Sequence, residues 1–314
     1  MNAPAPEGAF GRAVLEGLTA QPKKLSPKWL YDEQGAALFE AITDLEEYYP
    51  TRTEIALLKQ SAPELVAGIG PDAVVIEFGA GSSLKTPILL EALDQPSLYA
   101  PIDIQQAYLD HSSAAIRARF PNLAVHPVLG DFTRLEALPL DFPQLDGPRV
   151  GFFPGSTIGN LDAGPMQTFL RASHALLGEG AILLVGVDTP KPLDVLIPAY
   201  DDAKDVTAEF NLNLLRRINS ELGANFDIGA FRHEARWNER DSRVEMHLVS
   251  VKEQTVGVLG VEISFAAGES IHTESSHKMA PEVFVQRAEA ADWSPDGLWL
   301  APGGMFSIHR LKAR

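Results

Sequence analysis

The feature that most constrains the fold is an alternation of short β-branched runs and helical patterns between Val74 and Asp188. Such alternation is typical of parallel strands joined by crossover helices. The expected strands are 74–78, 98–104, 123–129, 149–153 and 181–187, and the expected helices are 84–93, 105–120 and 165–177. So short a stretch indicates an open, doubly wound α/β sheet, because a closed eightfold barrel needs ~250 residues.

The rhythm changes after Asp188, which predicts an inserted segment. A long helix is expected over 193–222, followed by strands at 231–237, 243–251 and 257–265. A helix at 281–291 and a final strand at 298–311 would then return to the parallel sheet, whereas residues 1–50 show helical patterning and no strand. We therefore expect a sheet domain of residues 52–190 and 279–314, and a second lobe of residues 1–51 and 191–278.

Composition limits the partners and the compartment. The formal net charge is -16 and no basic patch interrupts it, so phosphate backbones and anionic membrane surfaces would be repelled. The chain has no cysteine, no metal-ligand spacing, no signal peptide and no run of ~20 apolar residues. These features predict a cytoplasmic protein with no metal, no nucleic-acid partner and no membrane association.

Glycines and acids follow the first three expected strands. Gly79 and Gly81 form a strand-to-helix turn after Glu77, and a nicotinamide fingerprint would need a third glycine where Leu84 stands. Class I methyltransferases use the same turn, with an acidic residue near the amino group of S-adenosylmethionine (SAM). Asp103 lies 22 residues after Gly81, where a carboxylate can accept ribose hydroxyls, although a helix N-cap explains it equally well.

The third and fourth strands add further candidates. Asp131 and Phe132 offer an acceptor for an adenine amino group with an aromatic ring beside it. Asn160 follows the fourth strand, where its amide could orient an amine substrate opposite a methyl donor, and the alternative is an Asn in an ordinary turn. Asn160 is not within the Asn/Asp-Pro-Pro-aromatic motif of nucleic-acid amino-methyltransferases, in agreement with the acidic charge.

Several further stretches together resemble the L-histidine Nα-methyltransferases of ergothioneine biosynthesis. The similarity runs over nearly the whole chain, and its most specific stretches are Glu46-Glu47-Tyr48-Tyr49-Pro50-Thr51-Arg52-Thr53-Glu54, Ser156-Thr157-Ile158-Gly159-Asn160-Leu161, Ala199-Tyr200-Asp201-Asp202, Val206-Thr207-Ala208-Glu209-Phe210-Asn211 and Thr273-Glu274-Ser275-Ser276. The resemblance implies a Rossmann-like class I methyltransferase domain with a substrate-binding lobe built from the N-terminal segment and an insertion. It also implies SAM-dependent Nα-trimethylation of L-histidine to hercynine by a monomeric enzyme.

The resemblance also implies a role for individual residues. The residues that would contact SAM are Gly79, Gly81, Lys85, Asp103, Asp131 and Phe132. Tyr48, Asn160 and Tyr200 would act catalytically by holding the carboxylate and amine of the substrate, and Glu274 and Ser276 would bind its imidazole. The rest of the substrate pocket would be lined by Tyr31, Thr207, Phe210 and Met246.

Strand geometry agrees with the imidazole assignment. Residues two apart on a strand point to the same face, so Glu274 and Ser276 can face one ring together. The residues that follow, Ser275-Ser276-His277-Lys278-Met279, leave room for preference toward a related amino acid such as tryptophan or tyrosine. A nicotinamide-dependent oxidoreductase is the alternative from another class of enzyme.

Overall fold

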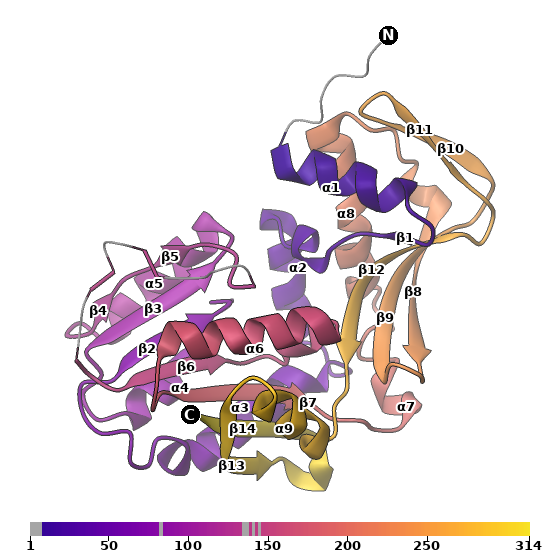
Figure 1. Ribbon diagram of the computed structural model, residues 1–314. Coiled ribbons are helices and arrows are strands. Elements are labelled where there is room, and N and C mark those ends of the chain that lie inside the picture. The colour runs from indigo at the N-terminus through magenta and orange to yellow at the C-terminus, as the bar shows by residue number, and fades with distance from the viewer. Residues whose placement is uncertain (1–7, 82–83, 134–137, 140–141, 144–145) are drawn as a thin grey trace. The chain divides into compact units, whose positions relative to one another are not determined.

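Three crossings of the chain divide it between two compact units in the computed structural model (Figure 1). The structure describes residues 8–81, 84–133, 138–139, 142–143 and 146–314. We call Pro50–Pro190 with Lys278–Arg314 the sheet unit, and Met1–Tyr49 with Lys191–His277 the insertion unit. Each unit is described by itself below.

The sheet unit contains the expected parallel strands. The strands of the whole sheet, parallel and antiparallel, are β2 Val74–Phe78, β3 Leu98–Asp103, β4 Ala124–Val125, β5 Val128–Leu129, β6 Arg149–Phe153, β7 Ile182–Asp188, β13 Trp293–Leu300 and β14 Phe306–Ala313. The strand order is β13-β14-β7-β6-β2-β3-β4, with β5 also paired to β3. Strands β2, β3, β6 and β7 run parallel, whereas β14 is antiparallel to both of its neighbours. The parallel strands therefore end at one edge, where the expected cofactor residues lie.

Helices cover both faces of this sheet because its central strands are apolar on both sides. Val74, Ile76 and Phe78 face the core under α6 (Ala163–Leu177) and α9 (Pro281–Glu289). Val75 faces the opposite core, to which α3 (Tyr49–Leu65), α4 (Thr86–Ala92) and α5 (Gln106–Arg119) contribute. Short 3-10 helices, η2 (Thr157–Asn160) and η4 (Pro302–Gly304), follow β6 and β13.

The insertion unit is built on a second, smaller sheet of order β1-β12-β9-β8. Its strands are β1 Lys23–Lys24, β8 Phe231–Asn238, β9 Arg243–Ser250 and β12 Ser270–His277, and a separate hairpin joins β10 Gln254–Val258 to β11 Val261–Phe265. Its helices are α1 Gly8–Thr19, η1 Pro27–Leu30, α2 Glu33–Thr43, α7 Leu193–Leu196, α8 Val206–Leu222 and η3 Ile228–Ala230. Helix α8 packs against β8, β9 and α2 through its buried apolar face.

Two expected elements of the insertion are each split in two. The single helix predicted over 193–222 is wrong: α7 ends at Leu196 and α8 begins at Val206. Asp205 interrupts it with a left-handed backbone at φ 60°, which an α-helix cannot contain. The strand predicted over 257–265 is instead part of the β10–β11 hairpin, because Leu259 and Gly260 both adopt positive φ and form its turn.

Three further expectations are corrected by the strand pairing. The strand predicted over 298–311 is the β13–β14 hairpin, turned at η4, and it returns antiparallel to β7. Residues 123–129 form two short strands, since Pro127 cannot donate to the ladder. The N-terminal segment does have a strand, because β1 pairs in parallel with β12.

Among the described residues, no helix is both long enough and apolar enough to cross a lipid bilayer.

Candidate active site

The turn after β2 is shaped for close approach by a ligand. Gly79 and Gly81 adopt φ of 80° and 44°, a region that side chains with a Cβ rarely enter. A Cβ on Gly79 would lie 3.5 Å from the Phe132 ring, so the glycine keeps the space between turn and ring open. Ser82 and Ser83 lie outside the described residues.

The ends of β3 and β5 meet beside this turn. Asp103 Oδ1 accepts a hydrogen bond from Gln105 N at 2.9 Å, and Gly130 N donates to Asp103 O, also at 2.9 Å. Burial raises the pKa of Asp103, and hydrogen bonds from backbone N–H groups, including those of Ala80 and Gly81, oppose that rise. A partly buried carboxylate against a glycine turn can accept hydroxyl groups from a ligand.

Asp131 and Phe132 occupy the neighbouring strand tip. Asp131 Oδ1 accepts from Thr133 N at 3.1 Å, which fixes its orientation. The Phe132 ring packs edge-on against Phe153, with centroids 5.3 Å apart, and against Phe169 at 5.8 Å. The structure thus brings Gly79, Gly81, Asp103, Asp131 and Phe132 to one edge of the sheet unit.

Glu77 has a different surrounding from the other acids at this edge. Its Oε2 accepts hydrogen bonds from Tyr99 Oη at 2.6 Å and Thr86 Oγ1 at 2.7 Å, which link β2, β3 and the start of α4. Burial raises the pKa of Glu77 to about 7, against these hydrogen bonds, which lower it. Its Oε2 is therefore occupied by hydrogen bonds within the protein, at the start of the glycine turn.

The raised pKa makes Glu77→Gln a test of pH-dependent stability. Between pH 4.5 and about 7 the folded chain keeps a proton that the unfolded chain has released, so the free energy of unfolding falls as pH rises. At ~1.4 kcal/mol per pKa unit, the Glu77 contribution is about 3 kcal/mol.

Urea unfolding at pH 5 and pH 7.5 should show Glu77→Gln gaining stability relative to wild type at the higher pH. The low pKa of His309, about 4 because of burial, acts equally in both proteins. Parallel profiles for the two proteins would contradict this account.

Lys85 and the Asn160 turn share one buried partner that the sequence analysis did not single out. Lys85 Nζ lies 2.5 Å from Glu54 Oε2, and Gly155 N donates to the same carboxylate, 2.8 Å from Oε2. Gly155 and Ser156 both have positive φ, and this turn leads directly into η2, whose last residue is Asn160. Glu54 lies within a stretch quoted above for the resemblance, but nothing in the pattern of α3 marks its role.

The aromatic residues predicted to bind the substrate form one cluster in the insertion unit. Tyr48 and Tyr200 have ring centroids 6.1 Å apart, and Tyr31 lies 5.4 Å from Phe210. Phe39 joins these pairs, with centroids 5.5 Å from Tyr31, 6.2 Å from Tyr48 and 6.0 Å from Phe210. Phe39 is not predictable from the sequence, because a phenylalanine on an amphipathic helix is indistinguishable from an ordinary core residue.

Glu274, Ser276 and Met246 lie on one face of the smaller sheet. Glu274 is directly opposite Met246, and the irregularity in β12 comes before Glu274, so Glu274 and Ser276 keep the same side. Ser276 Oγ and Tyr200 Oη are 2.8 Å apart, and the Glu274 and Ser276 side chains are buried. The predicted imidazole pair is therefore next to the aromatic cluster.

Thr207 is held in place by Asp202, which lies in the loop before α8. Thr207 N donates to Asp202 Oδ2 at 2.8 Å, and Val206 N donates to Oδ1 at 3.1 Å. Burial raises the pKa of Asp202, but the hydrogen bonds have the larger combined effect, so the pKa is lowered. The carboxylate thus satisfies the first N–H groups of α8 and holds Thr207 and Phe210 on its first turns.

The predicted residues fall into two sets. The five cofactor residues at the sheet edge, Lys85 and Asn160 belong to the sheet unit, whereas the remaining substrate residues belong to the insertion unit. Within each unit the contacts above join the members. The assembly of both sets into one active site stays a prediction.

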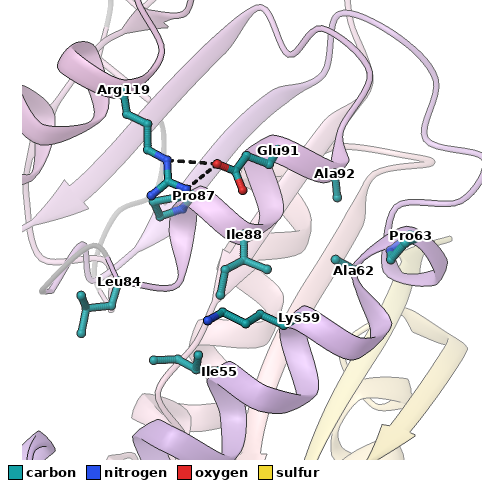
Figure 2. Close-up of a pocket in the computed structure, with 10 residues that line it drawn as sticks. All are labelled: Ile55, Lys59, Ala62, Pro63, Leu84, Pro87, Ile88, Glu91, Ala92 and Arg119. Carbon is teal, nitrogen blue, oxygen red and sulfur yellow. Dashed lines mark hydrogen bonds and ion pairs between the residues drawn. The ribbon is translucent and has the colours of Figure 1, made fainter.

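One surface hollow of the sheet unit is formed by residues other than those predicted for the site (Figure 2). It measures about 550 Å³ and is lined by residues of α3, α4 and α5, including Lys59 and Arg119, and by Leu84 from the turn before α4. None of the predicted site residues lines it. Among the described residues, no three His, Asp or Glu side chains form a group that could hold a metal ion.

Comparison with known proteins gives this geometry a context. The family described as SAM-dependent, histidine-specific methyltransferases matches residues 10–313. The chain belongs to this family. It is 43% identical to the histidine N-alpha-methyltransferase of Mycolicibacterium smegmatis, over 96% of this chain and 94% of that protein. The histidine N-alpha-methyltransferase of Mycobacterium tuberculosis is 40% identical over the same shares.

Family membership confirms the predicted fold class, the SAM cofactor and a methyltransferase activity. The alternative of a nicotinamide-dependent oxidoreductase is therefore wrong. A more distant relative, the 4-dimethylallyltryptophan N-methyltransferase of Claviceps purpurea, is 28% identical over 71% of this chain and 67% of that protein. Relatives of this methyltransferase family thus bear names with different amino-acid substrates.

Proposed function

We propose that this methyltransferase transfers three methyl groups in succession from SAM to the α-amine of L-histidine, giving hercynine, the first step of ergothioneine biosynthesis. The observation that carries the proposal is the buried Glu274–Ser276 pair beside Tyr200, in a chain that aligns with two histidine N-alpha-methyltransferases over 96% of its length. The insertion unit would bind the amino acid, and the sheet unit would bind SAM.

The residues at the sheet edge fit SAM. Gly79 and Gly81 leave room where side chains would intrude, Asp103 offers a carboxylate for the ribose hydroxyls, and Asp131 and Phe132 offer an acceptor and a ring for the adenine. Lys85 can donate only, so its partner would be the carboxylate of SAM. When bound, SAM supplies a methyl group on a positively charged sulfur.

Substrate choice would depend on pairing at the imidazole. Glu274 can accept one ring N–H while Ser276 bonds the other nitrogen. The Tyr200 hydroxyl, 2.8 Å from Ser276 Oγ, can donate to that oxygen and leave the Ser276 proton for the ring. A substrate without both ring nitrogens leaves a buried polar group unpaired, which the site would reject.

Rate enhancement would come from positioning. The α-amine must be neutral and aligned with the methyl group, and Asn160 and the Tyr48 hydroxyl can hold its hydrogen atoms while solvent takes the released proton. As methyl groups accumulate the amine becomes a fixed cation. The faces of Tyr48 and Tyr200, whose rings are 6.1 Å apart, can accommodate that charge.

Purified protein with SAM and each of histidine, tryptophan and tyrosine tests the proposal directly. Mass spectrometry should detect mono-, di- and trimethylated histidine in succession, with hercynine as the final product. A reaction without SAM is the control. Faster turnover of tryptophan or tyrosine than of histidine would contradict the proposal. It would instead support the second candidate function, N-methylation of tryptophan or tyrosine, which is suggested by the tryptophan-derived substrate in the name of the Claviceps relative.

The proposal includes a monomer working in the cytoplasm on a free amino acid, without nucleic acid. The net charge of -16 supports solubility and disfavours phosphate partners. Light scattering on a sizing column measures the oligomeric state.

A further inference from the structure

Glu54 is a buried carboxylate that the chemistry proposed above does not use. Its side chain is 1% exposed on α3, yet it contacts two separate parts of the predicted site. One is Lys85, which precedes α4 after the glycine turn, and the other is the N–H of Gly155, which begins the turn to Asn160.

The position of this carboxylate is tightly defined. Gly155 N donates to both oxygens, at 3.0 Å to Oε1 and 2.8 Å to Oε2. Strand β7 has no side chain at Gly186, where a Cβ would lie 2.1 Å from Glu54 Oε1. Glycine there leaves the space that the carboxylate occupies, so strand β7, the turn after β6 and a lysine together fix one acidic group.

We propose that Glu54 is a positioning residue, which holds Lys85 and the Gly155–Asn160 turn in a fixed relation. By balancing the Lys85 charge, Glu54 also sets the affinity for SAM relative to that for its product, S-adenosylhomocysteine (SAH). The inference rests on the assignment of Lys85 and Asn160 to the site, but not on the identity of the amino-acid substrate.

Charge explains the discrimination. SAM and SAH share every group except the sulfonium methyl, so SAM carries one more positive charge. With Glu54 in place, the Lys85–Glu54 pair is neutral as a whole and does not oppose that charge. Without Glu54, the lysine charge is unbalanced and disfavours SAM more than SAH, whereas without Lys85 the lone carboxylate has the opposite effect. Two unit charges about 12 Å apart at an effective dielectric constant of about 20 interact strongly enough to change an affinity on the order of tenfold.

Titration calorimetry with SAM and SAH, without amino acid, tests the charge balance. We expect Glu54→Gln to raise the ratio of Kd for SAM to Kd for SAH by roughly tenfold, Lys85→Met to lower it, and the double variant to lie between the singles. Glu91→Gln removes the carboxylate of the exposed Glu91–Arg119 pair and is the matched control, with an unchanged ratio. A purely structural role would weaken both ligands equally, so equal weakening in both single variants overturns the proposal.

Turnover tests the positioning of Asn160. Glu54→Gln should lower kcat by more than it raises KM for the amino acid, and Glu54→Asp, which keeps the charge but retracts it, should keep the SAM-to-SAH ratio near wild type while kcat still falls. If Glu54→Gln does not fold by circular dichroism, Lys85→Met alone decides the ratio by its opposite sign. A wild type that binds neither ligand would contradict the cofactor assignment itself, whereas absence of hercynine would leave this test intact.

Discussion

Lys278→Met is expected to lower the free energy of unfolding by about 3–5 kcal/mol, the cost of leaving a buried charge without its partner. Lys278 Nζ lies 2.7 Å from Asp188 Oδ2, and both side chains are fully buried where the chain leaves and re-enters the sheet unit. Met279 N also donates to Asp188 O, which ties the two segments together. Urea unfolding followed by circular dichroism measures the loss.

Two variants frame this prediction. Adding Asp188→Asn to Lys278→Met also removes the buried carboxylate charge and should recover most of the lost stability. Lys252→Met disrupts an exposed pair with Asp227, in which both side chains are more than half exposed, and should cost less than ~1 kcal/mol. A Lys278→Met protein as stable as the Lys252→Met protein would show that the buried pair contributes no net stability.

Glu274→Ala should weaken histidine binding by well over tenfold while leaving SAM affinity unchanged. A buried imidazole N–H that loses its acceptor costs ~1–3 kcal/mol, and the adjacent Ser276 cannot replace a carboxylate on the other side of the ring. Calorimetry of histidine binding to the protein saturated with SAH gives the affinity without turnover.

Conservative and distant variants make that result specific. Glu274→Gln keeps a carbonyl acceptor and should lose less affinity than Glu274→Ala. Glu262→Ala removes an exposed carboxylate from β11 of the same unit and should bind histidine like wild type. Unchanged affinity in Glu274→Ala would refute the imidazole role, even if the enzyme methylates histidine.

Much of the sheet unit could be predicted because its signal is local. Strands β2, β6 and β7 are runs of buried apolar residues, and each follows from composition and length alone. The failures have local causes too: Asp205, Leu259 and Pro127 interrupt elements whose apolar pattern continues across them. Strand β1 was missed because two lysines, one of them buried, do not resemble a strand.

The candidate site was predictable to the extent that residue type states its chemistry. Glycines at a strand tip and Asp103 each indicate a ligand group, and the family resemblance assigned Glu274, Ser276 and the aromatic residues. Phe39 and Asp202 were missed since their roles depend on neighbours: Phe39 touches three predicted residues, and Asp202 accepts the N–H groups that begin α8.

The sequence by itself determined the alternation of parallel strands and helices along the chain, the family and the residue types that a SAM site needs. Those properties reside in short stretches, where periodicity and turn chemistry act over a few positions. Only the tertiary structure decided that Glu54 reaches Gly155, 101 positions away, and that Asp188 meets Lys278. Whether a charge is buried, and which partner balances it, depends on packing between distant segments, and no local pattern contains that information.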